Sequence, residues 1–229
     1  MKKIGLIGGT TWISTLEYYR IINETIEEKL GGLHSAHCIL YSVDFDEFIL
    51  KHKGKWEEIS VLFVDIAKKL ERSGADFLIL CANTLHIIAD DIQNNINIPL
   101  LRITDVTAEK IIESGLKKVG LLGTIYTMED EFYKSRLKKK FNIETIIPES
   151  EDRNIINNVI INELSHEIIK KSSKQNFIKI IDKLVINGAE GIILGCTEIP
   201  MLIKKSDVNV PIFNTTFIHA KAAVEYALK

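Results

Sequence analysis

A cysteine, a hydroxyl and a carboxylate follow one another at Cys196-Thr197-Glu198, directly after Gly195 and the apolar run 192–194. Such a run is typical of a buried parallel strand, and in open α/β sheets ligands bind at the carboxyl ends of these strands. A lone cysteine in this place is more often a small core residue. The polar neighbours of Cys196 and the adjacent glycine favour instead a thiol that does chemistry at a strand end.

The elements that would position this thiol follow from hydrophobic periodicity. The predicted strands are 3–7, 38–43, 77–80, 99–103, 118–122, 143–147, 191–194 and 211–213. The predicted helices are 16–30 (with Thr15 as its N-cap), 56–72, a stretch carrying Leu85, Ile88 and Ile92, then 128–140, 154–164, 176–187 and 216–228. Strands that alternate with helices of this length predict a parallel, doubly wound α/β fold.

The chain also resembles itself. Residues 74–80 (GADFLIL) match residues 188–194 (GAEGIIL) at an offset of 188 − 74 = 114, and the turns Gly9-Thr10 and Gly123-Thr124 have the same offset. Two independent pairs at one offset indicate an internal duplication. The sequence therefore predicts two similar domains with parallel sheets, and a site in the cleft between them.

The expected domains are 1–97 and 98–213, with a C-terminal helix at about 214–229 that packs back on the first. A duplication kept for folding alone is the alternative. At the offset of 114, Cys196 corresponds to Ala82, and Cys81 lies one residue early.

Composition restricts the possible partners. The 229 residues are 46% hydrophobic and 26% charged, and a formal net charge of -2 gives no reason to expect nucleic acid. No apolar run approaches the roughly 20 residues that span a bilayer, and the first apolar run is too short for a signal peptide, so we expect a cytoplasmic protein with no membrane contact. Cys38, Cys81 and Cys196 lack metal-ligand spacing, which favours reduced thiols and no metal.

Five motifs together resemble the aspartate/glutamate racemase family, the pyridoxal-phosphate-independent amino-acid racemases. They extend over nearly the whole chain: GGTTW at 8–12, GGLHSA at 31–36, Asn83-Thr84, LGT at 122–124 followed by YTM at 126–128, and GCTE at 195–198. The resemblance implies two similar α/β domains, often in a homodimer, and a small amino-acid substrate held between two cysteines without a cofactor.

Racemisation removes the α-proton on one face of a carbanion and returns a proton on the other, so it needs an acid and a base on opposite sides. The resemblance implies that the catalytic candidates are Cys196, Cys81 and Thr84. The candidate substrate-binding residues are Thr10, Ala82, Asn83, Thr124, Thr127, Lys170, Thr197 and Glu198. Each threonine could instead be a helix cap, and Lys170 a solvated helix residue.

This chain departs from the family at the first cysteine, whose place before Asn-Thr is taken by Ala82. Neighbouring side chains on a strand point to opposite faces, so Cys81 is expected to be buried rather than catalytic. Three readings remain: a two-thiol racemase using Cys81, a slow racemase with Thr84 or water opposite Cys196, and a one-thiol decarboxylase or cis-dicarboxylate isomerase. A non-catalytic amino-acid or dicarboxylate sensor is a further alternative.

The substrate is expected to be aspartate, glutamate or a broader range of amino acids. Lys170 falls roughly where the family carries a lysine for the distal carboxylate. His166, Glu198 and His219 are further candidates, although His219 on an apolar helix face is more typical of a core histidine.

Overall fold

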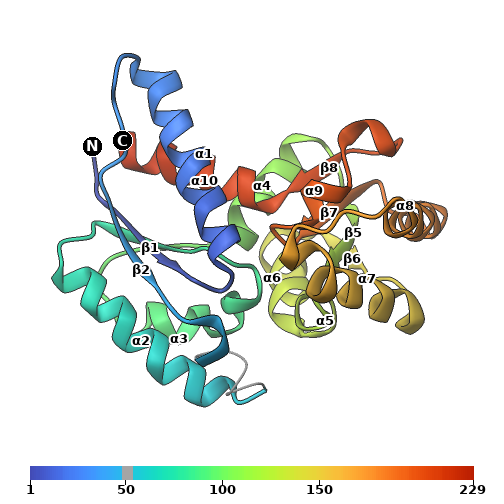
Figure 1. Ribbon diagram of the computed structural model, residues 1–229, viewed down its shortest axis with the longest axis horizontal. Helices are drawn as coiled ribbons and strands as arrows, with labels where there is room; N and C mark the ends of the chain where they lie inside the picture. Colours follow the sequence, from blue (N-terminus) through green and yellow to red (C-terminus); the bar gives the residue numbers. More distant parts are fainter. Residues whose placement is uncertain (48–53) are drawn as a thin grey trace. The chain divides into compact units, whose positions relative to one another are not determined.

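The computed structural model describes residues 1–47 and 54–229. In this part, the chain forms two compact units, residues 1–103 with 219–229 and residues 104–218. Each unit has a four-stranded parallel sheet with helices on its faces (Figure 1). The predicted α/β class and the prediction of two similar parallel-sheet domains are confirmed.

The first unit has its strands in the order β2-β1-β3-β4. They are β1 (Ile4–Gly8), β2 (Cys38–Ser42), β3 (Phe77–Leu80) and β4 (Leu100–Leu101). Its helices include α1 (Trp12–Leu30), α2 (Trp56–Arg72), the 3-10 helix η2 (Thr84–Ile88), α3 (Ala89–Gln93) and most of α10 (Thr215–Leu228). Because β1 pairs in parallel with both β2 and β3, the carboxyl ends of these strands meet at one edge of the sheet.

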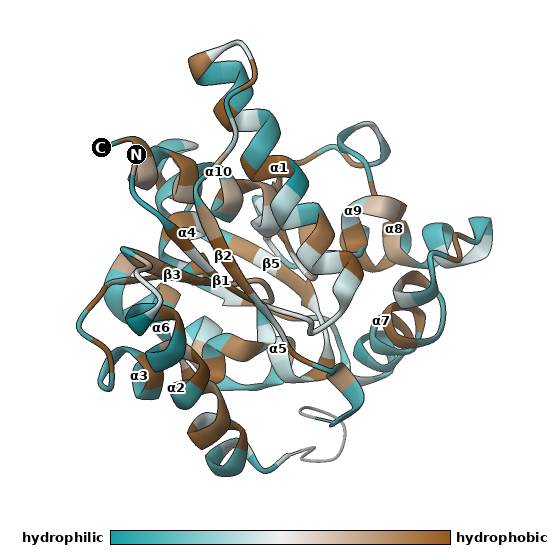
Figure 2. Cartoon of the chain, turned by 60° about the vertical axis from the view of Figure 1, so that its left-hand side comes forward, coloured by the Kyte–Doolittle hydropathy of each residue, from teal (hydrophilic) through white to brown (hydrophobic). Residues whose placement is uncertain are grey.

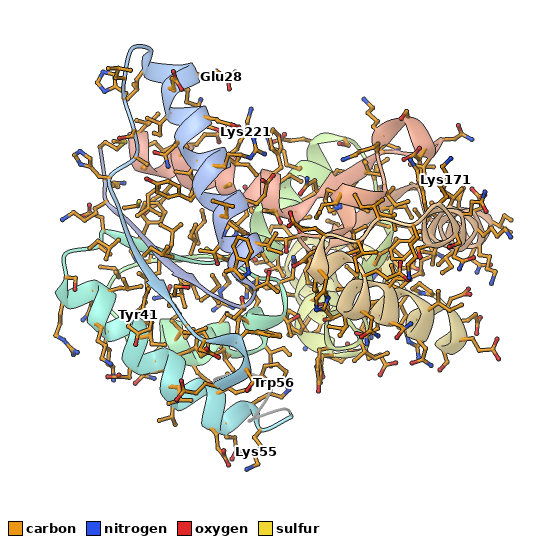
Figure 3. All side chains as sticks on the ribbon, in the orientation of Figure 1. Glu28, Tyr41, Lys55, Trp56, Lys171 and Lys221 are labelled. Carbon is orange, nitrogen blue, oxygen red and sulfur yellow. The ribbon has the colours of Figure 1, made fainter. Side chains whose placement is uncertain are left out.

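Alternate side chains of β3 face opposite sides of the first sheet. Phe77 packs in a cluster with α1 and α10, whereas Leu78 packs in a cluster with α2 and α3. Lys221 Nζ on α10 lies 3.8 Å from Glu28 Oε2 on α1; both residues are labelled in Figure 3. Hydrophobic and hydrophilic residues alternate along α2 (Figure 2), as an amphipathic helix that covers a sheet requires.

The second unit repeats this topology in the order β6-β5-β7-β8. Its strands are β5 (Lys118–Gly123), β6 (Glu144–Ile146), β7 (Gly191–Gly195) and β8 (Ile212–Asn214). Its helices are α4 (Ile103–Glu113), α5 (Ile125–Glu129), α6 (Glu131–Phe141), α7 (Ser150–Asn162), η3 (Leu164–His166), α8 (Lys171–Ile186), α9 (Ile199–Leu202) and η4 (Lys205–Asp207). Among the residues described, no helix is long and apolar enough to cross a membrane.

The repeat extends to individual hydrogen bonds. After α2, the Ala75 N–H donates to Leu70 O, and after α8 the Ala189 N–H donates to Leu184 O, so that donor and acceptor both move by 114. At this point the two units therefore have equivalent backbone hydrogen bonds. The loop that leads into β3 and the loop that leads into β7 close in the same way.

The strand at Leu100–Leu101 belongs to the first sheet, where it pairs with β3. Residues 98–103 therefore lie in the first unit, whereas we had expected the second domain to begin at 98. This strand has only two residues, so its hydrophobic periodicity could not show to which sheet it belongs. Ala220 and Val224 of α10 lie in the core of the first unit, on which the C-terminal helix packs.

Four predicted helices differ from the structure: α7 begins at Ser150 rather than at 154, and α8 begins at Lys171 rather than at 176. Helix α1 begins at Trp12 rather than Leu16, because Thr11 Oγ1 accepts from the Ser14 N–H and so caps the helix in place of Thr15. The predicted helix 128–140 is two helices, since the backbone is extended at Asp130. Helix α4 was not predicted.

Candidate active site

Strand β7 ends at a glycine that leaves no room for a side chain. A Cβ atom added to Gly195 would lie 2.8 Å from Leu122 O and 3.3 Å from the Thr127 methyl carbon. The chain therefore stays close to β5 up to Gly195 and then turns. Cys196, the next residue, is half-buried and packs against the cluster formed with α7 and α8.

The Cys196 thiol has a carboxylate as its hydrogen-bond partner. Cys196 Sγ donates to Glu198 Oε2 at 2.8 Å, and Thr197 Oγ1 donates to the same oxygen at 2.7 Å. Glu198 is only 3% exposed. Three consecutive residues thus form a compact polar cluster at the end of β7.

Burial raises the pKa of the Cys196 thiol well above its ordinary value. The charge of the Glu198 carboxylate and its hydrogen bond raise the pKa further, while the backbone N–H groups of Glu198 and Thr197 lower it. At neutral pH the group is consequently a thiol whose proton is directed at a carboxylate. Sequence reasoning placed Glu198 near the substrate and missed this contact, although a carboxylate two residues from a cysteine in a tight turn was a usable signal.

Thr124 and Thr127, predicted to bind substrate, lie beside Cys196 at the end of β5. Thr124 Oγ1 caps α5 by accepting from the Thr127 N–H at 3.3 Å, and the two hydroxyl oxygens are 3.2 Å apart. Thr127 is fully buried, and its methyl carbon would lie 2.9 Å from a Cβ atom added to Gly123. Thr127 is therefore a buried residue whose N–H is capped by Thr124, and Thr124 is the half-buried hydroxyl of the pair.

In the first unit the corresponding turn follows β1. The Gly9 N–H donates to Thr15 Oγ1 at 2.7 Å, and Thr15 Oγ1 donates to Thr11 O at 3.1 Å. Thr10 Oγ1 is buried and has no hydrogen-bond partner among the described residues. Because a buried hydroxyl normally has a partner, Thr10 is a candidate for a ligand contact.

Cys81, at the end of β3, is 0% exposed and lies in the cluster between the sheet, α1 and α10. Its carbonyl accepts from Ser14 Oγ at 2.6 Å, which holds this part of the chain against α1. Burial raises the pKa of the Cys81 thiol far above its ordinary value. Cys81 is thus buried, as the alternation of side chains along the strand predicted, and the two-thiol reading in which Cys81 is catalytic stays a prediction.

Ala82 takes the place that Cys196 has in the second unit. It is half-buried and packs against the cluster formed with α2, as Cys196 packs against the cluster with α7 and α8. Asn83 is 4% exposed and precedes η2, and Thr84, the first residue of η2, is half-buried. The end of β3 thus carries an amide and a hydroxyl and no accessible thiol.

The remaining candidates lie in different surroundings. Lys170 Nζ pairs with Glu163 Oε1 at 3.1 Å, and the Lys170 side chain is 55% exposed. His166 belongs to η3. His219 is fully buried and bonded to Tyr18 and Leu101, which makes it a core histidine. Within residues 1–47 and 54–229, no group of three or more His, Cys, Asp or Glu residues could hold a metal ion.

The chain is similar to known proteins in sequence and in fold. The model of the family described as Asp/Glu/Hydantoin racemase matches residues 7–223. The broad specificity amino-acid racemase RacX of Bacillus subtilis is 25% identical over 226 residues, which are 96% of this chain and 96% of RacX.

Two solved structures cover the whole of this chain and are wholly covered by it. A Yersinia pestis protein provisionally assigned as an Asp/Glu racemase is 48% identical with a TM-score of 0.94. An aspartate racemase homologue from Pyrococcus horikoshii is 40% identical with a TM-score of 0.89.

Proposed function

The chain belongs to the Asp/Glu/Hydantoin racemase family, and from this premise we propose that Cys196 transfers the α-proton of its amino-acid substrate. Membership makes the protein an amino-acid racemase and hence an isomerase. The observation that carries the proposal is the hydrogen-bonded thiol at the end of β7. A thiol in such a place can take a proton from Cα and give one back.

The second face of the substrate needs a different proton carrier. Cys81 is a core residue and Ala82 has no exchangeable proton, so the end of β3 offers Thr84 or a water molecule that it binds. A hydroxyl is a far weaker acid than a thiol. We expect racemisation to be slow and limited by the step on this face.

We propose that the carbanion is stabilised without a cofactor. In the absence of an electron sink, its charge has to be met by donors directed at the substrate carboxylate. Thr10, Asn83, Thr84 and Thr124 are the candidates, because they follow strand ends and carry hydroxyl or amide groups. The partnerless hydroxyl of Thr10 gives the strongest support for a carboxylate contact.

Aspartate and glutamate are the proposed substrates, with a broader range as the alternative. The two similar solved structures bear the names of Asp/Glu and aspartate racemases, whereas RacX is named for broad specificity. An acidic substrate would compete for the exposed Lys170 ammonium with Glu163, whose side chain is 13% exposed. Faster turnover of neutral amino acids than of aspartate and glutamate would rule out the acidic preference.

The test is proton NMR of L-aspartate and L-glutamate in D2O with the wild type and with Cys196→Ala and Cys38→Ala. Cys38 begins β2 of the first sheet, at the amino end of a parallel strand, and is therefore a half-buried control thiol away from the carboxyl ends of the strands. We expect deuterium at Cα and D-product with the wild type and Cys38→Ala, and neither with Cys196→Ala. Full activity of Cys196→Ala would refute the proposal.

A second candidate function is favoured by the pairing of a half-buried thiol in the second unit with an alanine at the equivalent place in the first. Because Ala82 takes the equivalent place in the first unit and has no exchangeable proton, Cys196 could deliver a proton from one face only, as decarboxylation of a malonate or isomerisation of a cis-dicarboxylate requires. Exchange at Cα without inversion would indicate this reading. Binding without exchange or turnover would indicate a sensor.

We also propose that the protein is a cytoplasmic homodimer that binds no nucleic acid. Three free cysteines support a reducing compartment. On α1, Trp12, Leu16 and Tyr19 are 65%, 56% and 47% exposed and share one helix face, which suits association with a second copy. Light scattering of the wild type and Leu16→Glu tests this: a monomeric wild type would contradict it.

A further inference from the structure

We propose that His86 is a positioning residue, which holds the peptide between Ala82 and Asn83 at the end of β3 and anchors it to the first residue of α4. The inference rests on the proposed function in so far as Asn83 takes part in substrate binding. It goes beyond that function by assigning a role to a buried residue of η2 that acts through its neighbours.

The His86 imidazole bonds to a backbone group with each of its nitrogens. Nδ1 lies 3.0 Å from Ala82 O, and Nε2 accepts from the Ile103 N–H at 3.1 Å. Because Nε2 is an acceptor, the ring proton is on Nδ1 and is donated to Ala82 O. Burial lowers the pKa of His86 to about 3, with His219 adding to the effect. At neutral pH the ring therefore keeps one donor and one acceptor.

The bond to Ala82 O sets the direction of the N–H group that follows. A trans peptide directs its C=O and its N–H to opposite sides, and the described residues contain no cis peptide bond. The Asn83 N–H therefore points away from the imidazole. The next peptide is held as well, since the His86 N–H donates to Asn83 O at 3.0 Å. His86 thus fixes both peptide groups that flank Asn83, a candidate donor to the substrate carboxylate.

The bond to Ile103 anchors the imidazole itself. Ile103 begins α4, and the first N–H groups of a helix have no acceptor within that helix. His86 Nε2 supplies such an acceptor and so caps α4. Ile103 is also the last residue of the first unit before the chain enters the second. The end of β3 is therefore tied to the point at which the chain leaves its unit.

The second unit has a corresponding link made by a different side chain. Thr215 begins α10, the helix with which the chain returns to the first unit, and its Oγ1 donates to Leu194 O at 2.9 Å. Leu194 lies two residues before Cys196. In both units, the helix that leads out of the unit thus begins with a link to the strand end that carries candidate residues. Unlike side chains in the same place support a need for this link.

Two substitutions of His86 each keep one of the two ring bonds. In His86→Asn the amide nitrogen takes the place of Nδ1 and can donate to Ala82 O, but no side-chain atom reaches Ile103. In His86→Gln the amide oxygen takes the place of Nε2 and can accept from the Ile103 N–H, but the bond to Ala82 O is lost. Each variant leaves one buried backbone group unpaired, so their stabilities should be similar, which urea denaturation checks.

Turnover distinguishes positioning from a purely structural role. With L-aspartate and L-glutamate, we expect His86→Gln to lower kcat about 10- to 100-fold with a smaller change in KM, because a displaced Asn83 meets the carbanion poorly. His86→Asn should lower kcat far less, since it keeps the Ala82 bond. A purely structural role predicts the same loss in both variants. Equal kcat values in the two variants would overturn the inference.

NMR of the uncomplexed protein tests the link without turnover. In His86→Gln, the amide nitrogen resonance of Asn83 should move and the Ile103 N–H should exchange as slowly as in the wild type. In His86→Asn, the Asn83 resonance should stay and the Ile103 N–H should exchange faster. An Asn83 resonance that does not move in His86→Gln would overturn the inference.

The wild type alone gives a further test, which holds even where a variant does not fold. Its imidazole nitrogen resonances should show that His86 is protonated at Nδ1 and unprotonated at Nε2. The opposite tautomer would overturn the inference. If the wild type turns over no amino acid, only the racemase proposal fails, and the resonances of His86 and Asn83 decide the inference by themselves.

Discussion

At the scale of single residues, the thiol of Cys196 and the methyl group of Ala82 occupy equivalent positions in the two units. Each lies two residues after the last leucine of a buried strand and packs against the core on the matching face of its sheet. A methyl group carries no exchangeable proton. The units are thus alike in shape and different in chemistry.

Ala82→Cys should supply the missing proton carrier. We expect the rate of racemisation to rise on the order of 100-fold, because a positioned general acid contributes about 10² to 10⁴. Chiral chromatography of the products from L-aspartate and L-glutamate measures this rate. Ala82→Ser is the size-matched control and should give little gain. A folded Ala82→Cys variant that racemises no faster would show that the end of β3 does not face the α-carbon.

At the scale of elements, the turn between β1 and α1 depends on one glycine and one threonine. Gly9 has φ +90, and a Cβ atom there would lie 2.1 Å from Val43 O, so only glycine fits. The Thr15 hydroxyl accepts from the Gly9 N–H and donates to Thr11 O, and so joins the turn to the first turn of the helix. This connection places Thr10 at the strand end.

Thr15→Val should lower the free energy of unfolding by about 1 to 3 kcal/mol, because a buried N–H group loses its acceptor. Urea denaturation measures this change. Thr25→Val on the same helix is the matched control, since the buried Thr25 hydroxyl only donates to the Ile21 carbonyl four residues earlier. Thr25→Val should lower the free energy of unfolding by less than Thr15→Val does. An equal loss in both variants would contradict the role of Thr15 in the turn.

At the scale of the whole molecule, the chain passes between the units twice, after residues 103 and 218. His219 Nε2 donates to Leu101 O at 3.0 Å, and its Nδ1 accepts from the Tyr18 hydroxyl. His86 Nε2 accepts from the Ile103 N–H at 3.1 Å, so its Nδ1 must carry the proton that it donates to Ala82 O. Two neutral histidines therefore form hydrogen bonds next to both points where the chain passes between the units. His86 also binds the carbonyl of Ala82, a residue of the candidate site.

Acid should destabilise the protein through these histidines. Burial lowers the pKa of His86 to about 3, with His219 adding to the effect, and burial lowers the pKa of His219 to about 4. Below the ordinary value of 6.5 the unfolded chain binds protons that the folded chain does not. Stability is therefore complete above pH 6.5 and falls as the pH drops toward 4. At pH 5 each histidine should lower the free energy of unfolding by about 2 kcal/mol relative to pH 7.5.

Urea denaturation at pH 7.5 and pH 5 tests this expectation, with His219→Gln as the comparison. Glutamine can accept from Tyr18 and donate to Leu101, but it does not titrate. The variant should lose about 2 kcal/mol less than the wild type between the two pH values. An equal loss in both proteins would show that other groups cause the acid sensitivity.

Much of the fold and part of the site were determined by the sequence alone. Helix α2 and strand β3 were predicted to the residue, because their periodicity and their flanking glycines are local signals. The repeat of 114 residues, which placed Ala82 opposite Cys196 in the alignment of the two halves, required only a comparison of the chain with itself. The thiol of Cys196 was placed at a strand end from the apolar run 192–194 that precedes it.

Only the tertiary structure decided where side chains point and which distant segments meet. Cys81 is a core residue because its face of β3 is covered by α1 and by α10, which comes from the other end of the chain. Strand β4 joined the first sheet through its pairing with β3. The Glu198 carboxylate turns toward sulfur because the chain bends after Gly195. Such contacts depend on the position of the backbone in space, which periodicity and spacing do not specify.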